Sequence, residues 1–388
     1  MKYRRARTLV FYWHDDELTV ENYLAPKQNG QEADNALAIE PLSVEVLHRL
    51  GDWVTESDAA AQFPNLPPDS VRETLTSLHR ASLLESEETA FASDRLAKEW
   101  AGWGEEARFF HFATRDATYA GVEPDVEMEF RRRRRESAGP PPPLFKVYPD
   151  APRVYLPRTF VPLEKRFGDV LAERRTHRTF HRDRLDPRVL STLLFHTFSP
   201  MFLRDADVLG TVAMKTSPSG GARHEIETYV AVNAVEAIAP GLYHYAPESH
   251  CLELLRSDLD EELLSRLCYG ISMPHDSAFV CFLTAVFRRR IWKYPHPRNY
   301  RVLMLGAGHI GQTFTLVATA LGLGAWQTIM FRDSELEAFL GIDGYAEGAL
   351  YMVGVGHSVT DSLDLPADFR MAPAVDWSEL FAPETLPR

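Results

Sequence analysis

Cysteine is scarce in this sequence, with three residues in a chain of 388. Cys251, Cys268 and Cys281 lie far apart and form no CxxC pair. Neither a disulfide framework nor a zinc site is therefore expected, because both need cysteines at regular or close spacing. Unpatterned thiols of this kind are typical of proteins of the reducing cytoplasm. We predict a cytoplasmic protein without a metal site.

The chain also has fewer positive than negative residues, 42 Lys and Arg compared with 55 Asp and Glu, which gives a net charge of −13. This balance disfavours nucleic acid as the main partner, since phosphate binds to a cationic face. The apolar run near the N-terminus, from Thr8 to Trp13, is shorter than a signal-peptide core. No apolar stretch is expected to span a bilayer, so we predict no membrane partner.

What the chain does have is length and apolar content. With 45% hydrophobic residues over 388 positions it can bury a large core, and its length suggests two domains. Shifts in composition divide it into a first domain at 1–115, a connector at 116–160 and a second domain at 161–388.

The first domain contains three expected helices, at 44–54, 57–63 and 67–84. Three helices followed by a short polar turn are typical of a winged helix-turn-helix. Residues 1–115 carry 12 Lys and Arg against 20 Asp and Glu, so binding of DNA is disfavoured. Docking of a peptide and dimerisation both remain open for this winged-helix-like domain.

The connector contains a polyproline segment, Gly139–Pro143, which is expected to be a semi-rigid spacer. Five arginines, Arg131–Arg135, precede it. A basic patch for an anionic partner is one interpretation. We favour a solvated helix end, because Glu127 and Glu129 stand at a spacing that allows pairing along a helix.

The second domain mixes helices and strands, which predicts an α+β or α/β sandwich. Strands are expected at 225–235, 278–287 and 349–355, and a long apolar segment at 302–321. Within that segment, Gly306–Gly311 reads GxGxxG, the fingerprint of a dinucleotide-binding Rossmann unit. We reject that interpretation, because too little chain follows it and the segment also reads as one buried helix.

Four segments of the second domain carry residues suited to chemistry. Arg174–Phe180 groups arginines with a hydroxyl, which suits a phosphate. Ser217–His224 contains adjacent glycines that allow close backbone approach to a flat ligand. Lys293 stands beside Tyr294, and an ammonium group can stabilise a phenolate that accepts a proton. Taken alone, Leu321–Thr328 is a glycine-terminated helix end.

In this order, the four segments resemble the nitroreductase superfamily, and more narrowly the SagB-type dehydrogenases that oxidise azolines in peptides. Pro240–Tyr245 and Gly308–Gln312 add to the resemblance, which spans about 160–357. It implies a nitroreductase-like FMN-binding α/β sandwich and a homodimer with FMN at the subunit interface. Two positions depart from the family pattern: Thr176 stands where Ser is common, and Glu225 where Pro is common.

The resemblance also implies roles for particular residues. The phosphate and ribityl end of FMN would be held by Arg174, Arg175, Thr176, Arg178 and, near the C-terminus, Arg370. The flavin ring would be lined by Pro218, Ser219, Gly220 and Gly221, with Gln327 and Thr328 near its reactive edge. Lys293 and Tyr294 match the pair that removes the substrate proton in azoline-oxidising members.

The leading hypothesis is therefore an FMN-dependent dehydrogenase or oxidase in natural-product biosynthesis. It would act on an azoline or related amino-acid-derived unit, peptide-borne or carrier-bound, and pass electrons to oxygen. The alternative enzyme is a nicotinamide-dependent nitro- or ene-reductase of the same fold. A winged-helix regulator and a non-catalytic scaffold are hypotheses of other classes, disfavoured by the acidic first domain and by the Lys293–Tyr294 pair respectively.

Overall fold

The computed structural model of this protein describes residues 1–25, 36–117, 124–207 and 210–359. These residues form two compact units, which we describe one at a time. Unit 1 is Met1–Glu127 together with His296–Arg298, and unit 2 is Met128–Pro295 with the chain from Asn299 onward. Most of the connector that the sequence suggested at 116–160 thus belongs to unit 2.

Unit 1 combines small antiparallel sheets with short helices. Its elements are β1 (Lys2–Arg5), β2 (Leu9–His14), β3 (Glu17–Asn22), β4 (Ala36–Ala38), α1 (Pro41–Arg49), β5 (Val54–Thr55), α2 (Glu56–Ala61), α3 (Pro68–Arg80), β6 (Leu84–Ser86), α4 (Phe91–Glu99) and α5 (Glu105–Ala113). Helices α1, α2 and α3 lie where the sequence predicted three helices. The expected apolar stripe of α3, Val71, Leu75 and Leu78, is buried in the core of the unit.

Helix α6 (Pro124–Ala138) leads the chain from unit 1 into unit 2. The helices that follow are α7 (Phe167–Glu173), α8 (Pro187–Phe198), α9 (Glu261–Leu267), α10 (Met273–Asp276), α11 (Phe287–Ile291), α12 (Tyr300–Ala320) and α13 (Asp333–Leu340). The strands are β7 (Arg153–Tyr155), β8 (Phe180–His181), β9 (Pro200–Asp205), β10 (Thr211–Lys215), β11 (Ile226–Val232), β12 (Gly241–Ala246), β13 (Cys251–Arg256), β14 (Phe279–Val286), β15 (Gly324–Thr328) and β16 (Glu347–Ser358).

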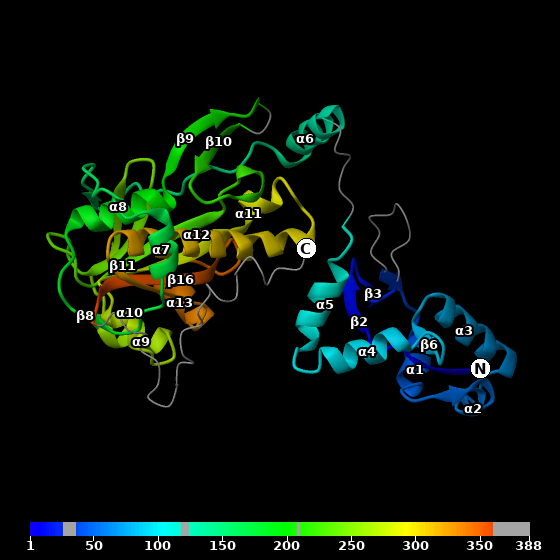
Figure 1. Cartoon of the computed structure of the whole chain (residues 1–388). Helices are drawn as coiled ribbons and strands as arrows, with labels where there is room; N and C mark the ends of the chain where they lie inside the picture. Colours follow the sequence, from blue (N-terminus) through cyan, green and yellow to red (C-terminus); the bar gives the residue numbers. More distant parts are fainter. Residues whose placement is uncertain (26–35, 118–123, 208–209, 360–388) are drawn as a thin grey trace, which may run out of the picture. The chain divides into compact units, whose positions relative to one another are not determined.

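An eight-stranded antiparallel sheet is the centre of unit 2. Its order is β15-β16-β14-β11-β12-β13-β7, and β8 pairs with β16. Successive residues of β11 point to opposite faces: Val230 and Val232 join one hydrophobic core, whereas Tyr229 and Ala231 join the other. Helices α8 and α12 cover the first face, and α9 and α13 cover the second (Figure 1). The predicted α+β sandwich is confirmed.

Helix α12 explains the GxGxxG sequence. Gly306–Gly311 lies in the middle of this 21-residue helix, so the rejection of a Rossmann turn is confirmed. One expectation needs correction, because the segment Pro297–Ala320 is long and apolar enough to cross a membrane by length and composition. Burial accounts for this apolar character: 56% of an apolar 18-residue window within the segment is buried, and Phe314 and Ala318 lie in the core.

Buried charges connect neighbouring strands of the sheet. Glu227 on β11 bonds His244 Nε2 on β12 at 3.0 Å and pairs with Arg289 on α11 at 2.5 Å. The other imidazole nitrogen, Nδ1, bonds Glu253 on β13 at 3.0 Å. Burial by itself would raise the pKa of Glu227, but the hydrogen bond from His244 and the charge of Arg289 outweigh it and lower that pKa to about 2.

This shift gives a prediction for stability against pH. Because the folded pKa of Glu227 lies below its usual 4.5, its ionisation contributes stability above about pH 4.5, and this contribution is lost as the pH falls towards 2. Glu227→Gln leaves Arg289 buried without its carboxylate, so the free energy of unfolding at pH 7 should fall by about 3–5 kcal/mol. The free energy of unfolding should also depend less on pH between pH 2 and 4.5. Denaturant unfolding between pH 2 and 7 measures both effects. Glu129→Gln, at an exposed ion pair, is the control, and an equal loss there would contradict the prediction.

Candidate functional site

The glycine-rich loop between β10 and β11 is held by hydrogen bonds at both ends. Ser217 Oγ lies 2.6 Å from Thr313 Oγ1, which joins the start of the loop to α12. Ser219 Oγ donates to Glu225 Oε2 at 3.1 Å and accepts from the backbone N–H of His224 at 3.0 Å. Gly221 has φ of +70°, a left-handed conformation that favours glycine. The loop is therefore a fixed feature beside α12.

The structure brings Lys293 and Tyr294 against this loop from more than 70 residues away. Lys293 Nζ donates to the carbonyl oxygen of Gly221 at 3.4 Å. A Cβ atom at Gly221 would lie 2.6 Å from Tyr294 Oη and 2.8 Å from Lys293 Nζ, so a side chain there would displace both groups. A Cβ at Gly220 would meet the Arg290 guanidinium at 2.8 Å. In this structure the two glycines admit the close approach of protein side chains.

Positive charge surrounds the Tyr294 phenol. The guanidinium carbon of Arg290 lies 4.6 Å from the ring centroid, and Lys293 Nζ lies 5.0 Å from it. Arg223 interacts electrostatically with Tyr294 and lies over the Trp292 ring at 5.5 Å. Cations at such distances stabilise a phenolate relative to the neutral phenol. The arrangement can hold Tyr294 as a proton acceptor.

Arg223 and Arg290 were missed in the sequence. Arg223 is 3% exposed, and its Nε and Nη2 find no hydrogen-bond partner among the residues that the structure describes. Burial lowers the pKa of Arg223 from its usual value. Arg290 donates to the carbonyl oxygen of Gly220 and, at 2.8 Å, to Asn299 Oδ1. The run Arg288–Arg290 was a visible signal, but only the fold shows which of its members faces the loop.

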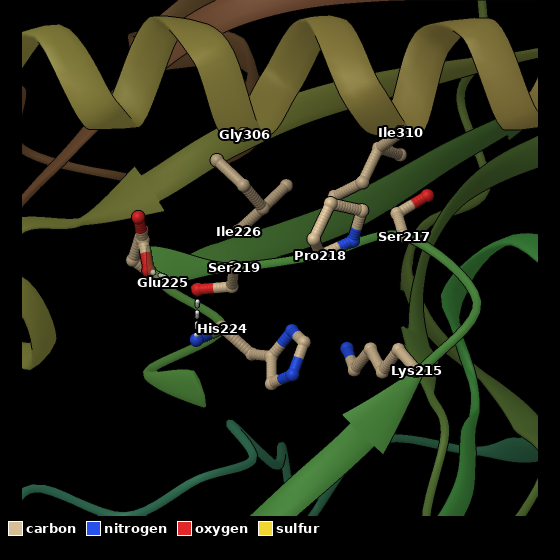
Figure 2. A pocket seen from close by; sticks show the side chains of 9 residues that line it. All are labelled: Lys215, Ser217, Pro218, Ser219, His224, Glu225, Ile226, Gly306 and Ile310. Atoms are coloured by element: carbon tan, nitrogen blue, oxygen red, sulfur yellow. Dashed lines mark hydrogen bonds between the residues drawn. The ribbon is translucent and has the colours of Figure 1, made fainter. Parts of the chain in front are cut away.

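A small cavity lies between the loop and α12 (Figure 2). Its volume is about 10 Å³, room for one water molecule and far too little for a flavin ring. It is lined by Lys215, Ser217, Pro218, Ser219, His224, Glu225, Ile226, Gly306 and Ile310. A flat ligand at this loop would therefore have to lie outside the cavity, on the side where Pro218 and Gly220 are exposed.

The ionisable groups of this cavity are strongly affected by burial. Burial lowers the pKa of Lys215 to about 8 and that of His224 to about 4, so His224 is neutral at pH 7. His224 Nε2 lies 2.7 Å from the carbonyl oxygen of Ala213, so it carries the ring proton. Glu225 is buried, and its Oε1 has no hydrogen-bond partner in the described part of the chain.

The arginine segment lies beside β15. Thr176 forms a parallel bridge with Ala325, and the His177 N–H donates to the Ala325 carbonyl at 2.9 Å. Gln327 and Thr328 end this strand. The structure thus brings together the arginine segment and the Gln327–Thr328 segment.

Arg174, Arg175 and Arg178 form no ion pair with any described residue, so they can receive an anion. Arg175 and Arg178 are exposed, and Arg174 is half-buried. Arg175 Nη1 donates to the carbonyl oxygens of Ala172 and Arg174 at 2.7 and 2.8 Å. Arg370, the remaining predicted phosphate ligand, lies outside the residues that the structure describes.

Gln327 connects the arginine side of the site to α12. A Cβ atom at Gly311 would lie 2.6 Å from Gln327 Oε1, so the glycine lets this amide approach the helix. Gln327 Oε1 is buried and accepts no hydrogen bond from the described residues. A buried acceptor without a donor is costly, so a bound donor would be favourable here. Gly306 and Ile310 of the same helix face the glycine-rich loop. Helix α12 thus contacts both Gln327 and the glycine-rich loop.

Comparison with known proteins identifies the family of unit 2. The nitroreductase family matches residues 171–357. A protein of Methanocaldococcus jannaschii that is named as a nitroreductase, MJ1384, is 31% identical over 198 residues, covering 50% of this chain and 93% of that protein. A crystal structure from Anabaena variabilis, also named as a nitroreductase, has a TM-score of 0.51 and 26% identity, covering 66% of this chain and 47% of that chain.

A further relative is the trifolitoxin-processing protein TfxB of Rhizobium leguminosarum bv. trifolii, which is 37% identical over 142 residues. That match covers 35% of this chain and 38% of TfxB, so this chain spans less than half the length of TfxB and of the Anabaena protein. The alignment with nearly all of MJ1384, together with the family match and the sandwich fold, shows that this chain belongs to the nitroreductase family.

Proposed function

We propose that this protein is an FMN-dependent dehydrogenase or oxidase of the SagB type. It oxidises an azoline, or a related amino-acid-derived unit, on a peptide or a carrier, and its electrons pass to oxygen. The observation that carries the proposal is the position of Tyr294, whose phenol lies against Gly221 among Lys293, Arg290 and Arg223. A reductase that takes hydride from a nicotinamide has no evident need for a phenol stabilised as a proton acceptor.

The arginine segment, the end of β15 and the glycine-rich loop carry residues that fit FMN. Arg174, Arg175 and Arg178 offer cationic donors for a phosphate, and Thr176 adds a hydroxyl. The unpartnered Gln327 Oε1 would accept an N–H of the flavin ring, and Thr328 lies next to it in the chain. Pro218, Ser219, Gly220 and Gly221 would form a wall along the ring.

The chain's own contribution to the reaction is binding and proton transfer. Tyr294, with Lys293, Arg290 and Arg223 close to it, would accept the proton from the acidic C–H of the azoline ring. When bound, FMN would supply a two-electron acceptor for the hydride of the neighbouring ring atom, with oxygen as the final acceptor of both electrons. The azoline thus loses one proton and one hydride and becomes the aromatic azole. Lys293, through its hydrogen bond to the Gly221 carbonyl, would keep the neighbouring Tyr294 against the glycine-rich loop.

The surface of α12 supports a homodimer. Met304 and Leu305 on this helix are 45% and 59% exposed, and Tyr300 one turn earlier is also exposed. Exposed apolar side chains next to one another are typical of an interaction surface.

We further propose that unit 1 docks the substrate peptide. TfxB is named for the processing of trifolitoxin, and its match lends support to a peptide substrate here. The acidic composition of residues 1–115 favours a peptide over nucleic acid.

A nicotinamide-dependent nitro- or ene-reductase is the second candidate, because MJ1384 is named as a nitroreductase. The visible spectrum of the purified protein, followed by anaerobic NADPH, separates the two. An oxidase should be yellow with FMN and stay oxidised, whereas rapid bleaching would favour the reductase. A colourless protein that FMN cannot reconstitute would remove both candidates.

Tyr294→Phe tests the proposed proton acceptor. The variant keeps the ring and its contacts with cations but lacks the hydroxyl, so FMN content should be unchanged. Oxidation of a synthetic thiazoline peptide, followed by mass spectrometry as loss of two hydrogens, should slow by about 100- to 10,000-fold. Tyr345→Phe, at an exposed tyrosine, is the matched control. Wild-type turnover by Tyr294→Phe would exclude this role.

Leu305→Asp tests the proposed dimer. A carboxylate on this exposed position should disrupt an apolar interface, so that sedimentation shows a monomer with less bound FMN. The control is Glu335→Gln, which alters an exposed charge on α13. If Leu305→Asp sediments as the wild type does, α12 does not form the interface.

A further inference from the structure

Helix α11 directly precedes the proposed catalytic pair and is very short. It comprises the five residues Phe287–Ile291, and Lys293 and Tyr294 follow within three positions. A helix of this length is not stable on its own, because one turn costs more entropy than its hydrogen bonds return. The location of Tyr294 must therefore come from contacts that other segments make with α11.

Two arginine side chains of α11 bind the sheet and the glycine-rich loop. Arg289 pairs with Glu227 of β11, and its Nη1 donates to the His224 carbonyl at 3.3 Å. Arg290 donates to the carbonyl of Gly220. None of these bonds involves the last carbonyls of the helix, which directly precede the catalytic pair.

The end of α11 is capped by Arg134 of helix α6. Arg134 Nε donates to the Trp292 carbonyl at 2.7 Å, and its Nη2 donates to the Ile291 carbonyl at 3.1 Å. Carbonyls in the last turn of a helix lack partners within the helix, and a cation there also interacts favourably with the helix dipole. One guanidinium thus satisfies two carbonyls, 158 and 157 residues away in sequence.

The polyproline segment adds two further bonds. The indole Nε1 of Trp292, a buried side chain, donates to the Gly139 carbonyl at 2.9 Å. Arg289 Nε donates to the Pro143 carbonyl at 2.8 Å. Proline rings restrict the backbone of this segment, so the two carbonyls belong to a stretch with little conformational freedom.

The arginine run therefore has two kinds of member. Arg132 and Arg133 are exposed and pair with Glu129 at 3.0 and 2.8 Å, as expected for a solvated helix end. Arg134 is half-buried and bonds the backbone of the catalytic segment instead.

We propose that residues 134–143 position the Lys293–Tyr294 pair, with Arg134 as the principal positioning residue. Loss of the Arg134 cap would let the end of α11 open and move the phenol away from Gly221. The connector between the two units would then be part of the catalytic apparatus. This inference rests on the proposed role of Tyr294, although the contacts themselves do not.

Hydrogen exchange of the full-length protein tests the contact without any substrate. The amides of Trp292, Lys293 and Tyr294 are bonded to the carbonyls of Arg288 and Arg290, and they report opening of this segment. In Arg134→Ala these amides should exchange about tenfold faster, as expected for loss of a charge-assisted bond. Arg132→Ala is the matched control and should exchange as the wild type does. Equal exchange in the two variants would overturn the proposal.

The catalytic consequence is measured with the thiazoline peptide. Arg134→Ala should lower kcat about tenfold with little change in KM. Arg134→Lys keeps the charge but not the two parallel N–H donors of the guanidinium, so its kcat should fall less. Adding Arg134→Ala to Tyr294→Phe should cause no further loss, because both act on one proton transfer. A full additional loss in the double variant would contradict a role through Tyr294.

These outcomes separate this inference from the proposed function. Full activity of Tyr294→Phe would end the proposed function, while the exchange experiment would still decide whether Arg134 holds the segment. If Arg134→Ala does not fold, Trp292→Phe replaces it, since it keeps an aromatic ring for Arg223 and the core but removes the indole N–H that bonds Gly139. The same faster exchange is then expected, and unchanged exchange would contradict the proposal.

Discussion

The buried ion pair between Glu227 and Arg289 joins the parts of unit 2 that its candidate site requires. Glu227 belongs to the centre of the sheet and Arg289 to the helix that leads to Tyr294. The same carboxylate accepts the backbone N–H of Lys146 at 3.1 Å, and the same guanidinium donates to Pro143. Two charges that are costly to bury singly thus hold the sheet, the short helix and the connector in one arrangement.

The strands and long helices of unit 2 could be predicted from the sequence, because burial on one or both faces leaves a regular apolar pattern. The expected strand at 225–235 is Ile226–Val232, and the expected buried helix at 302–321 is Tyr300–Ala320. The composition of the 302–321 segment alone does not separate the two cases, because a helix buried in a sandwich and a membrane span have similar composition.

The site was only partly predictable. The motifs around Gly220 and Tyr294 were visible, as was the arginine segment, because together and in this order they resemble a known family, although each alone is weak evidence. Their contacts were not visible, because they depend on side chains distant in sequence. Arg223 and Arg134 were overlooked for this reason: each lies in a local setting that a solvated arginine would share.

The connector also constrains how this protein can be divided or rearranged. A fragment beginning near residue 161 would contain every strand of the sheet except β7, yet it would lack Arg134, Gly139 and Pro143. Each residue added to the polyproline segment would displace its ends by about 3.1 Å, more than a hydrogen bond tolerates. The length of this linker should therefore vary less during evolution than that of an ordinary interdomain spacer, and exchange of unit 1 between relatives would have to preserve it.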